Sequence, residues 1–151
     1  MGELKDRLRA DLTEAMRARD ELRTGTIRMA LTALTTAEVA GTTARELTDT
    51  EELAVITRES RKRREAADAF REGGRTDRAE REDAEAGVLA GYLPPQLDDT
   101  ELARLVDAAV SEAGASSPRD MGRVMQLLTP RVAGQAEGRR VADAVKARLS
   151  V

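Results

Sequence analysis

The chain has 151 residues, a formal net charge of −3, one Tyr, one Phe, and no Trp, Cys or His. That length fits one ordinary domain or two small helical ones. The missing residue types exclude thiol chemistry, disulfides, Cys/His zinc sites and imidazole catalysis, and the scarcity of aromatic residues disfavours a β-sandwich or barrel core. No metal or cofactor is predicted. No apolar run approaches the roughly 20 residues that span a bilayer, and no signal-peptide core is present. We therefore expect a cytoplasmic protein without a membrane partner.

Helical periodicity runs along the whole chain, and strand alternation is absent. Apolar residues at four-residue steps predict a first helix over residues 3–19, with one buried stripe of Leu4, Leu8, Leu12 and Met16. A second helix follows and ends near Gly41. The segment 20–22 between them is either a turn or a continuation of the helix.

Local end signals bound the next two helices. Thr48 and Glu51 have the spacing of a capping box, which predicts the start of a third helix. Gly73 and Gly74 are expected to end it, and Thr76 to cap a fourth.

Pro94 and Pro95 interrupt the helical pattern and form the clearest boundary, because neither supplies an N–H group. The sequence then predicts a fifth helix behind a capping box at 98–101, ending at Gly114. A sixth helix is expected behind Ser117 as N-cap, broken by Pro130, and a seventh over residues 139–149, after a loop at 134–138.

The predicted fold class is therefore all-α, with two helical domains joined by a Pro-Pro hinge. The N-terminal domain, residues 1–93, has four helices, and the small C-terminal domain, residues 94–151, has three. A domain of that size is stable when it is well packed.

One cluster of cations lies in the third helix. Arg58, Arg61 and Lys62 fall within one sector of about 100°, which would let them meet phosphates. Opposite charges four residues apart, such as Arg61 and Glu65, also occur along this helix. We favour the interpretation of a solvated helix face stabilised by its own ion pairs.

A second charge pattern lies in the C-terminal domain. Residues 94–118 have a net charge of −4, and residues 119–151 a net charge of +4. A basic segment in an acidic protein is typical of a local nucleic-acid footprint, and the helix starts near Pro118 and Gly138 would add phosphate-facing N–H groups. The alternative is that cations gather near helix C-termini because the dipole favours them there. Both interpretations remain open.

Catalysis has no support from the residues. The serines have no histidine partner, and Ser117 is better explained as an N-cap. The glycines of loop 134–138 follow no strand, so the loop is neither a P-loop nor a dinucleotide fingerprint. No catalytic residue is predicted.

Several segments together resemble the YqeY family, a free-standing relative of the tail domain of the GatB subunit of glutamyl/aspartyl-tRNA amidotransferase. The resemblance covers nearly the whole chain. It is carried by Tyr92-Leu93-Pro94-Pro95-Gln96-Leu97, Gly114-Ala115-Ser116-Ser117 and Asp120-Met121-Gly122-Arg123-Val124-Met125, and upstream by Ile27-Arg28-Met29, Glu38, Arg58 to Glu65, Phe70 and Gly74-Arg75-Thr76-Asp77.

The resemblance implies an all-helical protein with a tail-like C-terminal domain. In the amidotransferase that domain helps to hold tRNA, whereas other parts carry out phosphorylation and ammonia release. Family members are commonly labelled carbon–nitrogen ligases with glutamine as amido donor. We interpret that label as taken over from the larger enzyme, because this chain lacks the nucleotide site and the amidase nucleophile.

One loop departs from the family pattern. The family places a Lys-Gly-Lys-Ala-Asp-Gly type sequence before the last helix, where this chain has Ala133-Gly134-Gln135-Ala136-Glu137-Gly138. Both cations are absent, which removes two phosphate contacts if the loop makes them in relatives.

The sequence thus leads to the hypothesis of a non-catalytic helical module that binds tRNA or another structured RNA. The residues expected to contact it are Arg119, Arg123, Arg131, Arg139, Arg140 and Lys146. Two alternatives remain. One is an accessory component of an amidotransferase-type carbon–nitrogen ligase, acting with a protein partner. The other is a protein-interaction adaptor, which the overall pI of about 5.2 favours slightly.

Overall fold

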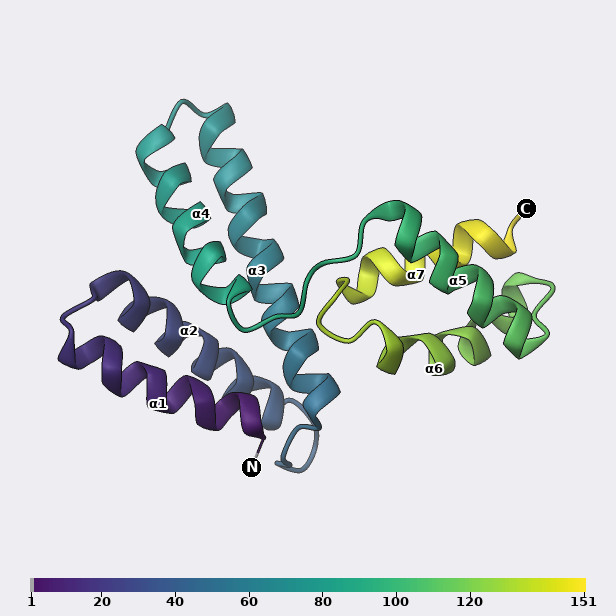
Figure 1. Cartoon of the computed structure of the whole chain (residues 1–151), viewed down its shortest axis with the longest axis horizontal. Helices are drawn as coiled ribbons and strands as arrows, with labels where there is room; N and C mark the ends of the chain where they lie inside the picture. Colours follow the sequence, from purple (N-terminus) through teal and green to yellow (C-terminus); the bar gives the residue numbers. More distant parts are fainter. Residues whose placement is uncertain (1) are drawn as a thin grey trace. The chain divides into compact units, whose positions relative to one another are not determined.

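The computed structural model describes residues 2–151, and throughout that range the regular elements are helices (Figure 1). The prediction of an all-helical fold is therefore confirmed. No helix of the described residues is both long and apolar enough to cross a membrane. The chain divides into two compact units, residues 1–94 and 95–151.

The N-terminal unit contains α1 (Glu3–Arg17), α2 (Glu21–Glu38), α3 (Asp49–Glu72) and α4 (Thr76–Ala90). In this unit α1 lies beside α2, and α3 lies beside α4 (Figure 1). The C-terminal unit contains α5 (Asp99–Ala113), the short 3₁₀ helix η1 (Pro118–Asp120), α6 (Met121–Arg131) and α7 (Gly138–Leu149).

Local caps define most helix starts in the N-terminal unit. The capping box of Thr48 and Glu51 is present at the start of α3, as predicted. Residues 20–22 form a turn and a helix start, because Arg19 has a φ of 56° and the Asp20 carboxylate accepts the Arg23 N–H at 3.1 Å. The prediction of Thr76 as a cap is wrong. Arg75 takes the cap position after the Gly74 turn, so Thr76 is already the first helical residue.

The buried face of α1 also differs from the predicted stripe. Leu8 is fully buried, whereas Met16 is 49% exposed and Ala15 takes the buried position near the end of the helix. Four-residue steps turn a helix by about 40° beyond a full circle each time. Three such steps therefore carry Met16 away from the core.

The N-terminal core combines apolar and polar side chains. Its largest fully buried apolar residues are Leu8, Ile27, Leu34, Ile56 and Leu89. Beside them, Lys5 of α1 pairs with Glu38 of α2 at 2.5 Å. Glu52 of α3 is only 2% exposed, and its Oε1 has no hydrogen-bond partner. Burial, together with the nearby carboxylates of Asp49 and Glu38, raises the pKa of Glu52 against the opposing effect of Lys5.

In the C-terminal unit the helix ends largely follow the sequence signals. The Asp98 carboxylate accepts the Glu101 N–H at 2.7 Å and so caps α5, and Gly114 ends that helix in the left-handed region at φ 63°. Pro130 does not break α6, which continues to Arg131. A proline in the last turn removes only its own N–H, so the helix loses one bond and still completes the turn.

The C-terminal core is aliphatic. It is formed by side chains from all three α-helices, among them Leu102, Val106, Val124, Leu128, Val141, Val145 and Leu149. Among the described residues, the buried polar and charged side chains all lie in the N-terminal unit. The C-terminal unit therefore places its charges on its surface, where the candidate interface was predicted.

Candidate nucleic-acid interface

The six predicted RNA-contacting cations lie on three elements of the C-terminal unit. Arg119 lies in η1, two arginines lie in α6, and the other three residues lie in α7. The unit as a whole, residues 95–151, contains eight basic and eight acidic residues and is therefore electrically neutral. The question is how many of the cations stay available to a phosphate.

Three of the six are held by acidic side chains and carbonyl oxygens of the same unit. Arg131 makes a two-bond pair with Glu112, at 2.7 and 2.9 Å. Arg140 donates to the Asp99 carboxylate at 2.7 Å and to the Leu97 carbonyl at 2.8 Å.

Arg123 is held in the same way. It donates to the Asp120 carboxylate at 2.5 Å and to the Ala113 carbonyl at 3.1 Å. Each of these three guanidinium groups already has a carboxylate partner that offsets its charge, which reduces its contribution to the affinity for a phosphate.

The pairs of Arg131 and Arg140 arise because the acidic α5 packs against the basic α6 and α7. Asp99 of α5 pairs with Arg140 of α7, and Asp107 pairs with Arg148. The two acids are eight residues apart along α5, and the two arginines are eight residues apart along α7. The two helices therefore advance in the same direction. The charge segregation seen along the sequence becomes charge complementarity between packed helices.

Both helix starts that were expected to offer free N–H groups already hold a carboxylate. Glu137 is the N-cap of α7 and accepts the Arg140 N–H at 3.2 Å. At η1, Asp120 accepts the N–H groups of Ser116 and Ser117 at 2.8 and 3.2 Å. The Ser116 amide and the Arg123 guanidinium lower the pKa of Asp120 to about 2. The prediction of phosphate-facing N–H groups at these two sites is thus not supported by the structure.

The loop that departs from the family pattern is fastened to the start of the unit. The Gln96 side chain donates to the Gly134 carbonyl at 2.7 Å, and the Leu97 N–H donates to the Gln135 carbonyl at 2.8 Å. Gly134 has a φ of 75°, a conformation that L side chains rarely adopt. The loop is thus held by hydrogen bonds to Gln96 and Leu97, and within it Glu137 serves as the N-cap of α7.

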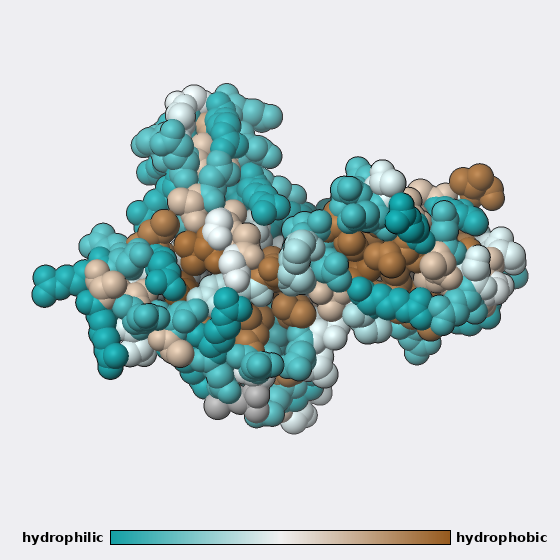
Figure 2. Space-filling model, in the orientation of Figure 1, coloured by the Kyte–Doolittle hydropathy of each residue, from teal (hydrophilic) through white to brown (hydrophobic). Residues whose placement is uncertain are grey.

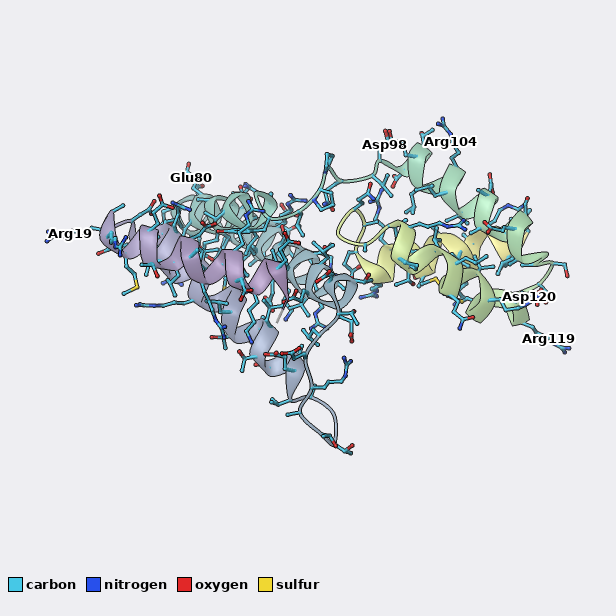
Figure 3. All side chains as sticks on the ribbon, turned by 60° about the horizontal axis from the view of Figure 1, so that its bottom comes forward. Arg19, Glu80, Asp98, Arg104, Arg119 and Asp120 are labelled. Atoms are coloured by element: carbon cyan, nitrogen blue, oxygen red, sulfur yellow. The ribbon has the colours of Figure 1, made fainter. Side chains whose placement is uncertain are left out.

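The remaining three cations, Arg119, Arg139 and Lys146, are exposed and form no ion pair among the described residues. Arg139 and Lys146 are seven residues apart, which places them on one face of α7. Arg119 projects away from the unit near η1, and Arg104, a further exposed cation without an ion pair in the described range, projects from α5 on the opposite side (Figure 3). Of the available cations, Arg139 and Lys146 therefore share one face of α7, whereas Arg119 and Arg104 lie at separate positions.

Within residues 2–151, no group of three or more carboxylates or other ligand side chains is placed to hold a metal ion. The site residues that sequence reasoning missed are the acids of α5, and their partners are up to 41 positions away along the chain.

The fold and the site together define a helical protein with a small, self-neutralised C-terminal bundle. A family model described as Yqey-like protein matches residues 5–149, and the chain belongs to this family. No curated protein matches the chain.

Proposed function

We propose that the protein is a non-catalytic binding module for tRNA or another structured RNA, and that the face of α7 with Arg139 and Lys146 makes the principal contact. The observation that supports this proposal is that these two exposed cations lie on one helix face without ion pairs in the described range. Arg119 adds a third available cation. Arg123, Arg131 and Arg140, which the sequence also suggested, have a mainly structural role in this proposal.

The test is a fluorescence titration of labelled tRNA, with an unrelated structured RNA for comparison, at about 50 and 200 mM salt. The double variant Arg139→Gln/Lys146→Gln should bind more weakly. Its plot of log affinity against log salt should be shallower by about 1.4 to 1.8, because each lost phosphate contact removes about 0.7 to 0.9.

Arg131→Gln is the matched control, because it removes one cation of the same unit that is already paired with Glu112. We expect it to leave the salt slope unchanged. Equal slopes for the wild type and the double variant, or no RNA binding at the lower salt, would refute the proposal.

The alternative function, an accessory component of an amidotransferase-type carbon–nitrogen ligase, is favoured by a different observation. A hollow of about 320 Å³ lies between α5 and α7, with an apolar floor that includes Leu102, Val106 and Ala144. The Arg140–Asp99 and Arg148–Asp107 pairs border it. Co-purification of ligase or amidase subunits that is lost on Ala103→Trp, together with an unchanged RNA salt slope in the double variant, would favour this alternative.

A further inference from the structure

In the N-terminal unit, a hollow with a volume of about 640 Å³ lies between α2 and α3. The α2 wall consists of Met29, Thr32, Ala33, Thr36 and Ala37, and Ala40 follows just after the helix. The α3 wall includes Ala54, Val55, Arg58 and Lys62, and Leu47 of the connecting loop contributes at one end. On the face drawn in Figure 2, hydrophobic residues of the N-terminal unit show among hydrophilic ones.

The residues that line each wall recur at a spacing of three or four along their helix. On α2 the repeat runs from Met29 to Ala37, and on α3 a similar repeat reaches Lys62. Two helices of a bundle present such stripes to a third helix that packs between them. The side chains along α2 are mostly Ala and Thr, so a third backbone can approach closely and insert larger side chains into the hollow.

The charges around the groove are confined to α3 and the loop. The Arg45–Glu51 ion pair closes the loop end. Arg58 is exposed and forms no ion pair among the described residues, and Lys62 lies one turn further along, 3.5 Å from Glu59. The α2 wall contributes no charged residue to the lining. Glu59 also lines the α3 side, so Arg58, Glu59 and Lys62 together give this edge a net charge of +1, whereas the α2 edge is neutral and bears hydroxyl groups.

We propose that this groove binds an amphipathic helix of a partner protein, with apolar residues at three- and four-residue spacing in the hollow and acidic residues along the edge formed by Arg58 and Lys62. The proposal concerns the other unit of the chain and does not depend on RNA binding. A second copy of this groove is a poor occupant, because two facing hollows leave a void where a packed interface needs contact. A nucleic acid would find an apolar floor and three cations, of which Arg45 and Lys62 are paired with Glu51 and Glu59.

The probe is a designed helical peptide of about 15 residues, which is about four helical turns. It has Leu at three- and four-residue spacing and Glu along one flank. A matched peptide has Lys in place of each Glu. Methyl NMR on the full chain follows Met29, Leu47 and Val55, and fluorescence anisotropy gives the affinities. We expect shifts confined to these groove methyls and binding of the acidic peptide at least tenfold tighter than binding of the basic one.

Two variants sharpen the test. Thr36→Trp places a bulky ring at an exposed position of the groove wall and should abolish binding. Arg58→Glu/Lys62→Glu should weaken the acidic peptide at least tenfold and strengthen the basic one. Arg64→Glu is the matched control, because Arg64 is an exposed cation of α3 outside the groove lining, and it should reduce binding less than threefold.

Four results would overturn the proposal. The first is equal affinity of the protein for the two peptides. The second is the absence of any methyl shift at about 1 mM acidic peptide. The third is a shift of the groove methyls when tRNA is added in place of the peptide. The fourth is a self-associated chain that Thr36→Trp converts to a monomer, because the groove would then hold a second copy of this protein.

Discussion

The two units differ in what they bury. The C-terminal unit encloses aliphatic side chains and pairs its charges across the surface, as in Arg148–Asp107. The N-terminal unit buries Lys5, Glu52 and several hydroxyl-bearing side chains. In the described range, the buried side-chain polar atoms without a hydrogen-bond partner also lie in the N-terminal unit, among them Thr26 Oγ1 and Ser60 Oγ.

This difference has an energetic meaning. Buried polar atoms that lack a partner cost about 1 to 3 kcal/mol each, and natural proteins tolerate such local conflicts mainly where function requires them. The charge pattern of the sequence indicated the C-terminal cations as the candidate site, whereas the costly features lie in the N-terminal unit. The groove between α2 and α3, for which we propose helix docking, is in that same unit.

The largest effect is expected from the aliphatic core. Leu128 is fully buried, and Leu128→Ala should cost about 3 kcal/mol through lost burial and a residual cavity. Because a unit of this size has a small stability, amide protection should collapse in α5, α6 and α7. Tyr92, the single tyrosine, packs in the N-terminal core, and its emission should stay native. Loss of protection in both units together would contradict their independence.

The buried ion pair should give the next largest effect. Lys5→Met leaves the Glu38 and Glu52 carboxylates without their cation, and we expect a loss of about 2 to 3 kcal/mol in the free energy of unfolding. Urea unfolding followed by Tyr92 emission measures it. Lys146→Met, at an exposed position, is the control and should change stability by less than about 0.5 kcal/mol. An unchanged or raised stability of Lys5→Met would show that the pair is dispensable.

Short-range signals in the sequence were sufficient for much of the fold. The capping box of Thr48 and Glu51 and the left-handed Gly114 depend only on neighbouring residues, so their positions could be predicted. The four-residue stripe of α1 failed at Met16, because a long helix drifts relative to that spacing. Helix existence is thus a local property, whereas the exact buried face depends on the packing partner.

The candidate site was less predictable because its chemistry is tertiary. Arg140 and Asp99 are 41 positions apart, and Lys5 and Glu38 are 33 apart. Along the sequence, Arg140 belongs to a basic segment and Asp99 to an acidic one. Only helix packing reveals that the two segments neutralise each other, and this pairs two of the six predicted cations, Arg131 and Arg140, with acids of the other segment.

The polar core of the N-terminal unit should also respond to pH. Burial raises the pKa of Glu52 above its unfolded value, so the folded state binds more protons than the unfolded state as pH falls towards that raised value. Stability from this group is therefore present at low pH and is lost as pH rises through the folded pKa. Glu52→Gln should remove this component from the pH profile of unfolding. A profile parallel to the wild type would show that Glu52 does not titrate in this way.

The smallest effect is expected from the surface pairs of the C-terminal unit. Arg148 and Asp107 are 48% and 61% exposed, with their nearest charged atoms 2.8 Å apart. A double-mutant cycle with Arg148→Gln and Asp107→Asn should give a coupling energy of about 0.5 kcal/mol or less, because exposed pairs are screened and their side chains lose entropy. At 1 M salt, where the screening length is about 3 Å, the coupling should vanish. A coupling energy above about 1.5 kcal/mol that persists at high salt would mean that charge pairing stabilises this unit as much as its aliphatic core does. The two units would then differ in where their charges lie, and not in how much those charges contribute to stability.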